Sequence, residues 1–118
     1  GAILSECLEA SDKLSEQGVG IDVFDCHTIK PFDAEGVGRI FSKYSLVVSV
    51  EEHFLNGGLF SIISQVKASN DFSGRLRGIG VDDSWVSPGE RPYVLEQLGL
   101  NADSIVAKIK SFTNEKGV

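Results

Sequence analysis

The chain has 118 residues, which is enough for one domain, 1–118, and too few for two. Its apolar fraction of 42% and charged fraction of 24% are typical of a globular protein, and no apolar run is long enough to span a membrane. The 11 Lys and Arg residues against 17 Asp and Glu residues give a net charge of −6, which disfavours binding to nucleic acid or to anionic lipid.

The first residues contain neither an initiator Met nor a basic signal region, so we expect a piece of a longer cytoplasmic protein. Cys7 and Cys26 are then expected to be reduced thiols inside the protein. The two Cys and two His residues have no spacing typical of metal ligands. The sequence therefore predicts no metal site.

The first third of the chain predicts helix, strand, helix. Apolar residues recur at helical spacing over 3–14, and Gly18 can take the left-handed conformation that ends a helix. The apolar run 21–26 predicts a mostly buried strand, which Pro31 ends. Asp33 can cap a second helix, whose apolar stripe runs from residue 37 to residue 44, although Gly36 and Gly38 weaken it.

The remainder predicts two more strands and three more helices. The β-branched run 46–50 is suited to a central parallel strand, and 75–81 is the third strand. A helix follows Gly57-Gly58 over 59–66. Two helical pieces, 93–98 and 102–112, form the tail, with Asn101 as the cap of the last. Strands that alternate with amphipathic helices predict an α/β fold with a parallel sheet covered on both faces.

Ligands of open α/β sheets bind beyond the carboxyl ends of the strands, where polar side chains gather in 26–33, 51–58 and 82–89. The glycines of Asn56-Gly57-Gly58 precede a helix, so the first amides of that helix can hold an anion; the alternative is a tight turn without a ligand. His53 beside Glu52 can act in acid–base chemistry. The alternative is that one glutamate binds backbone or an arginine and that His53 lines an interface.

Adjacent strand residues point to opposite faces, so Glu51 and Glu52 are not both expected in one site. His27 and Lys30 can grip a phosphate or hold a subunit contact. Trp85 is predicted either to anchor a subunit contact or to cover the domain's own core. Asp82-Asp83 lacks the further oxygen ligands of a cation site. No serine has the setting of a hydrolase nucleophile, so no catalytic residue is assigned.

The order of motifs resembles the C-terminal domain of transketolase-like enzymes. The motifs are Glu9-Ala10 on the first helix, Thr28 to Asp33, Val50-Glu51-Glu52-His53 with Gly57-Gly58-Leu59, Arg77 to Asp82, and Leu98-Gly99-Leu100. The version with Glu-Glu-His and Gly-Gly is most similar to split transketolases and to deoxyxylulose-phosphate synthase. The beta subunits of 2-oxo acid dehydrogenases are more distant.

The resemblance implies a three-layer α/β/α sandwich with a mostly parallel sheet, here without its first strands. It implies a parent transferase of carbohydrate metabolism that moves two-carbon or acyl units with thiamine diphosphate and Mg²⁺. The cofactor is implied to lie between other, N-terminal domains, so this domain binds no cofactor. The implied role is homodimerisation and possible regulation. From the residues themselves, we expect Glu52, His27 and Trp85 at an interface and an effector or anion at Asn56, Gly57, Gly58, His53 and Lys30.

Three alternatives stay open at this point. The chain can be a free-standing module that binds a phosphate or another anion at the start of the helix after Gly58. It can be the C-terminal domain of a 2-oxo acid dehydrogenase beta subunit. It can also be a small independent enzyme that uses His53 and Glu52. An incomplete sheet would leave an apolar edge, which we expect a second copy of the chain to cover.

Overall fold

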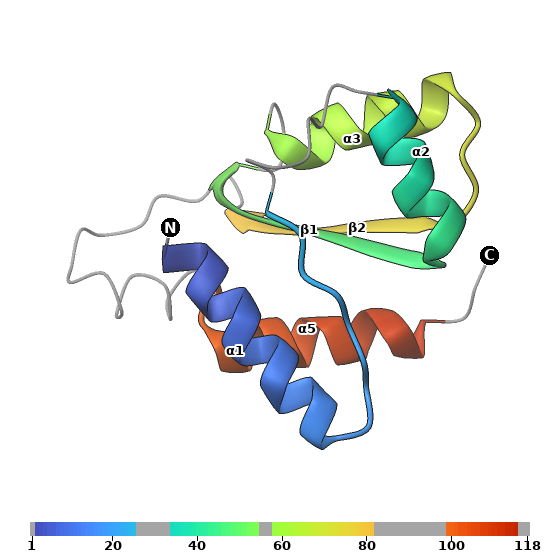
Figure 1. Cartoon of the computed structure of the whole chain (residues 1–118). Helices are drawn as coiled ribbons and strands as arrows, with labels where there is room; N and C mark the ends of the chain where they lie inside the picture. The colour runs from blue at the N-terminus through green and yellow to red at the C-terminus, as the bar shows by residue number, and fades with distance from the viewer. Residues whose placement is uncertain (1, 26–33, 55–57, 82–98, 116–118) are drawn as a thin grey trace. The chain divides into compact units, whose positions relative to one another are not determined.

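The computed structural model describes residues 2–25, 34–54, 58–81 and 99–115 of the chain (Figure 1). Its contacts divide the chain into two compact units, one of residues 1–23 with 83–118 and one of residues 24–82. The α/β class predicted from the sequence is confirmed, and the assignment of all 118 residues to one domain stays a prediction.

The second unit is built around a parallel pair of strands, β1 (Leu46–Phe54) and β2 (Arg75–Val81), joined by helix α3 (Leu59–Ser69). Leu46 pairs with Arg75 and Val50 with Ile79, and the register shifts between Val50 and Phe54. Parallel strands require such a crossover connection, because a hairpin can join only antiparallel ones. The predicted strand 75–81 is confirmed, and the predicted strand 46–50 is extended to residue 54.

Helix α2 (Ala34–Lys43) lies beside α3 on the same face of the strand pair (Figure 1). Val37 and Phe41, four residues apart, are its buried residues, as helical spacing predicts. The Phe41 ring stacks on Phe72 with a centroid distance of 6.4 Å, and Lys67 of α3 lies 5.7 Å from the centre of the Phe41 ring. The apolar centre of this unit is thus formed where α2 meets the segment after α3.

The first unit pairs the two ends of the chain, α1 (Ala2–Glu16) and α5 (Ala102–Asn114). The helices share a buried core of small and aliphatic side chains: Ala10, Leu14, Leu100, Ala102, Ile105 and Ile109. Gly18 ends α1 with a φ of 81°, as predicted, and Val19 N–H donates to Leu14 O at 2.9 Å. Removing the apolar surface of these side chains from water is what holds α1 and α5 together.

One predicted element is wrong within the described residues. Residues 21–25 do not form a strand, although their apolar pattern favoured one. A strand exists only where a neighbour completes its hydrogen bonds, and 21–25 pair with neither β1 nor β2. Phe24 is 48% exposed and packs edge-to-face against Tyr44 at 5.9 Å.

Two other predictions fall on residues outside those described, namely Asp33 as a helix cap and the helix 93–98. Among the described residues, no helix has the length and hydropathy needed to cross a bilayer.

Candidate functional site

The carboxyl end of β1, where the sequence predicts a polar cluster, presents Glu51 to the first turn of α3. Glu51 Oε1 accepts a hydrogen bond from Leu59 N–H, and Glu51 Oε2 accepts one from Phe60 N–H, both at 2.9 Å. Glu51 is only 6% exposed. Charge-assisted bonds of this kind are among the stronger hydrogen bonds, so Glu51 ties the strand firmly to the helix that follows it.

The carboxylate of Glu51 takes the place of a side-chain cap at the start of α3, because the N-cap residue Gly58 has no side-chain acceptor. Gly58 is extended, with φ −99° and ψ −155°, and has no side chain that could accept from the helix amides. The first amides of a helix lack partners within the helix and attract negative charge. Glu51 supplies both the acceptor and the charge. The interpretation that one glutamate of this cluster binds backbone is confirmed.

Glu51 and Glu52 differ as strand alternation predicts. Glu51 is buried on the side that meets α3, whereas Glu52 is half-buried. Ser49 precedes Glu51 by two residues, so its side chain lies on the same face of β1. It is 4% exposed, and its Oγ has no hydrogen-bond partner among the described residues. This face of β1 therefore carries one fully bonded polar side chain and one unbonded one.

Of the residues predicted to bind an anion, the structure describes Gly58 and the backbone of His53. The predicted residues Lys30, Asn56 and Gly57 lie outside the described residues. Of the predicted interface residues, Glu52 is described, and His27 and Trp85 are not. Whether these side chains meet at one site stays a prediction. The two amides of Leu59 and Phe60 are the part of the predicted anion site that the structure describes, and both donate to Glu51.

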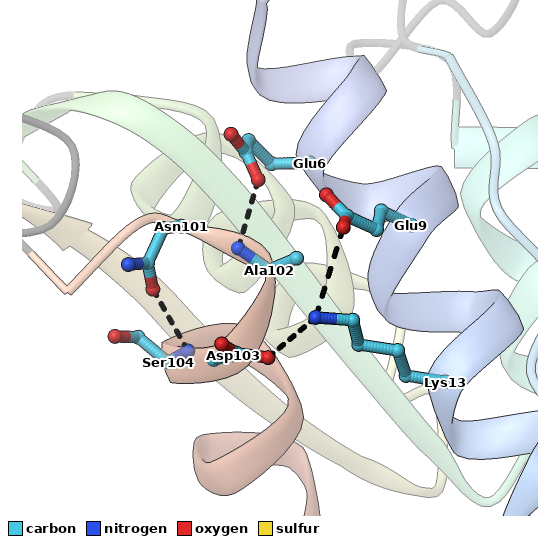
Figure 2. Close-up of polar contacts among 7 residues, drawn as sticks. All are labelled: Glu6, Glu9, Lys13, Asn101, Ala102, Asp103 and Ser104. Atoms are coloured by element: carbon cyan, nitrogen blue, oxygen red, sulfur yellow. Dashed lines mark hydrogen bonds and ion pairs between the residues drawn. The ribbon is translucent and has the colours of Figure 1, made fainter. Parts of the chain in front are cut away.

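A second carboxylate performs the same task in the first unit. Glu6 Oε2 on α1 accepts from Ala102 N–H of α5 at 2.8 Å, and Asn101 Oδ1 accepts from Ser104 N–H at 2.9 Å (Figure 2). The predicted cap Asn101 is confirmed. Glu6 was not predicted, since no local spacing links it to a residue 96 positions away. An acidic residue on the half-buried side of a helix is the signal the sequence offers.

An ion-pair cluster lies one helical turn or more further along α1. Lys13 Nζ lies 2.6 Å from Asp103 Oδ1 and 3.7 Å from Glu9 Oε1 (Figure 2). The hydrogen bond to Asp103 raises the pKa of Lys13 above its ordinary value, with smaller contributions from the charges of Asp103 and Glu9. These groups are largely exposed, so the cluster contributes little to stability and offers no dry site for chemistry.

Cys7 of α1 is a half-buried free thiol, as the sequence predicts. Burial, followed by the negative charge of Glu6, raises the pKa of Cys7 from 9.0 to about 11. A thiol with a raised pKa is a poor nucleophile. Within the described ranges, no three His, Cys, Asp or Glu side chains come together as metal ligands would.

Comparison with known proteins assigns the chain to a protein family. The family described as "Transketolase, C-terminal domain" matches residues 1–105. The chain is 36% identical over 116 residues to a 6-deoxy-6-sulfo-D-fructose transketolase subunit of Clostridium sp. (strain MSTE9), covering 98% of this chain and 36% of that protein. It is 33% identical over 116 residues to 1-deoxy-D-xylulose-5-phosphate synthase 2 of Kitasatospora griseola, covering 98% of this chain and 18% of that protein.

A solved structure shares the fold. It is a "Split gene transketolase, inactive beta4 tetramer", and it aligns with a TM-score of 0.81 at 30% identity over 94% of this chain and 36% of its own. The chain thus spans about a third or less of the length of these relatives. The match over residues 1–105 and the shared fold show that this chain belongs to the family of transketolase C-terminal domains.

Proposed function

We propose that this chain acts as an accessory C-terminal domain in a transketolase-type, thiamine-diphosphate-dependent enzyme. In this role it contributes contacts between subunits, and the cofactor chemistry takes place in other domains of the parent protein. The observation that carries the proposal is the family match over residues 1–105, together with relatives of which this segment covers only 36% and 18%. The parent reaction is a two-carbon ketol or acyl transfer.

We propose that thiamine diphosphate and Mg²⁺ are held by other domains of the parent, and two contacts of the described residues support this. A diphosphate would need free amides or basic side chains, and the amides at the start of α3 already bind Glu51. Mg²⁺ would need carboxylates directed toward a common point, whereas Glu51 and Glu6 are each bonded to a helix start. We therefore assign no catalytic step to the described residues.

Isothermal titration calorimetry tests the assignment of roles. The purified chain is titrated with thiamine diphosphate in the presence of Mg²⁺, and we expect no heat of binding. A titration with Mg²⁺ alone serves as the control for weak binding of the cation to this acidic chain. Saturable one-to-one binding of thiamine diphosphate would refute the accessory role, because the cofactor would then be held by this domain.

We further propose that the chain forms a homodimer and contacts the N-terminal cofactor domains of its parent. The related split-gene transketolase is described as a tetramer of beta chains, which supports self-association of this kind of subunit. Light scattering over a range of concentrations tests the first part. A dimer mass that falls on dilution is expected, and a monomer at every concentration would contradict it.

The 2-oxo acid dehydrogenase alternative has less support. The relatives named above are a transketolase subunit and a deoxyxylulose-phosphate synthase, and the printed name of each contains a sugar derivative. We therefore favour a sugar-phosphate or sulfosugar substrate class for the parent. Activity assays that show whether a sugar derivative is among the substrates or products of the parent protein would distinguish the two classes.

A further inference from the structure

The amino end of α3 holds a carboxylate in the geometry in which it would hold a bound anion. Two adjacent amides, Leu59 N–H and Phe60 N–H, each donate to a different oxygen of Glu51 at 2.9 Å. The helix dipole favours negative charge at this position. Because Glu51 is only 6% exposed, it is a bound group and not a surface side chain that passes by.

Both halves of this arrangement come from the fold. Gly58 at the N-cap has no side-chain acceptor, so the amides of Leu59 and Phe60 bond to a group from another part of the chain. Strand β1 brings Glu51 to them from eight positions earlier in the chain. A tethered ligand acts at an effective concentration in about the millimolar range or above, so a free anion competes poorly. Displacement would also leave the Glu51 charge buried without partners.

We propose that Glu51 is a built-in ligand that closes the amino end of α3 to phosphate and carboxylate compounds. The sequence around the start of α3 thus resembles a phosphate site, but the amides of Leu59 and Phe60 are occupied by the chain itself. Any phosphate of a substrate or effector is bound by other groups. This inference goes beyond the accessory role proposed above and does not depend on it, because it concerns only contacts between β1 and α3.

The test compares the full 118-residue chain with its Glu51→Ala variant by amide-resolved NMR. Each is titrated with sodium acetate and, separately, with inorganic phosphate at constant ionic strength. In the wild type, the Leu59 and Phe60 amide signals should stay in place. In Glu51→Ala, they should shift saturably with acetate, and the melting temperature, lowered by on the order of 5 °C, should rise again with acetate.

Glu16→Ala is the matched control, because it removes one exposed carboxylate and changes the net charge equally. Glu16→Ala should show neither the lowered melting temperature nor the acetate-dependent shifts of the Leu59 and Phe60 amide signals. If Glu51→Ala does not fold, Glu51→Gln keeps the shape of the side chain but offers only one acceptor oxygen. Hydrogen exchange of at least one of the two amides should then be faster than in the wild type.

Saturable phosphate or acetate shifts of Leu59 and Phe60 in the wild type would overturn the proposal. Unchanged exchange of both amides in Glu51→Gln, or a folded Glu51→Ala without any response to acetate, would do so as well. These outcomes are read at the Leu59 and Phe60 amides with inorganic phosphate and acetate, whereas the accessory role is tested by calorimetry with thiamine diphosphate, so the two failures are distinguishable.

Discussion

Glu6 Oε2 lies 2.8 Å from the backbone nitrogen of Ala102, and this hydrogen bond joins the first helix of the chain to the last. The acceptor is a half-buried carboxylate, and the donor is one of the amides at the start of α5 that have no acceptor within the helix itself. The start of α5 is thus held from two sides, by Asn101 within the same segment and by Glu6 from α1. Folding of α5 and docking of α1 are consequently coupled.

Replacing Glu6 by Ala should lower the free energy of unfolding by about 1–2 kcal/mol, because Ala102 N–H loses its acceptor and α5 loses a favourable charge. Urea unfolding followed by circular dichroism measures this. Glu9→Ala is the control, since Glu9 lies 3.7 Å from Lys13 at the surface and should cost less than about 0.5 kcal/mol. Equal costs for the two variants would show that the Glu6 bond adds nothing.

Gly36 and Gly38 on α2 offer a matched pair for a second prediction. A Cβ atom at Gly36 would meet nothing closer than Arg39 Nη2 at 3.7 Å, whereas one at Gly38 would lie 2.8 Å from Phe72 Cζ. The Phe72 ring is half-buried and stacked on Phe41, so moving it away would disturb that ring contact. Gly36→Ala should therefore stabilise the chain by about 0.5–1 kcal/mol through helix propensity, and Gly38→Ala should destabilise it.

Thermal unfolding of the two variants, which differ only in position, checks this prediction. A stabilised Gly38→Ala would mean that the Phe72 ring has room to shift. A destabilised Gly36→Ala would mean that the helix there needs the freedom of glycine for a reason outside the described contacts.

The same two glycines show where sequence reasoning succeeds and where it stops. Their cost to helix α2 follows from propensity alone, and the spacing of Val37 and Phe41 predicts the buried face correctly. The reason for a glycine at position 38 cannot be predicted from the sequence, because Phe72 lies far along the chain and approaches Gly38 only in the folded structure. Local sequence patterns predict local structure, whereas a contact between residues far apart in the chain can be identified only once the fold is known.

In the candidate site, too, the contacts between residues close in the chain can be predicted from the sequence and the distant ones cannot. Asn101 is predictable as a cap because its partner, Ser104, is three residues away. Glu51 is predictable as one of two outcomes, since the sequence places it at a strand end before a glycine turn but leaves its partner open. For Glu6, no local pattern points to its partner Ala102, which lies 96 positions away. The failed strand at 21–25 has the same origin, because an apolar pattern cannot specify a pairing partner.

Ser49→Ala should leave stability unchanged or raise it by up to about 1 kcal/mol. The Ser49 hydroxyl is buried and has no partner in the part of the chain that the structure describes, and removing an unsatisfied polar group removes its desolvation cost. Ser42→Ala is the control, since the exposed Ser42 Oγ donates to Arg39 O at 2.8 Å and should change stability by less than about 0.5 kcal/mol. A loss above about 1 kcal/mol in Ser49→Ala would indicate that the hydroxyl has a partner after all.

The raised pKa of Cys7 predicts slow alkylation. With a pKa of about 11 instead of 9.0, the thiolate fraction at pH 8 falls roughly a hundredfold. In a Cys26→Ser background, which leaves one thiol, iodoacetamide should react about a hundred times more slowly with the folded chain than with the chain unfolded in urea. Equal rates would show that the Cys7 thiol is neither buried nor influenced by Glu6.

The same shift makes the chain less stable in alkali. Because the folded pKa of Cys7, about 11, exceeds the ordinary value of 9.0, the unfolded chain loses this proton first. The contribution of Cys7 to stability is therefore complete below pH 9 and is lost as the pH rises toward 11. The raised pKa of Lys13 acts in the same direction at still higher pH.

Urea unfolding at pH 8, 9.5 and 10.5 should show a steady decline in the free energy of unfolding, and this decline should be shallower in Cys7→Ala. If the decline were equally steep in that variant, Lys13 and other groups, and not the Cys7 thiol, would account for it.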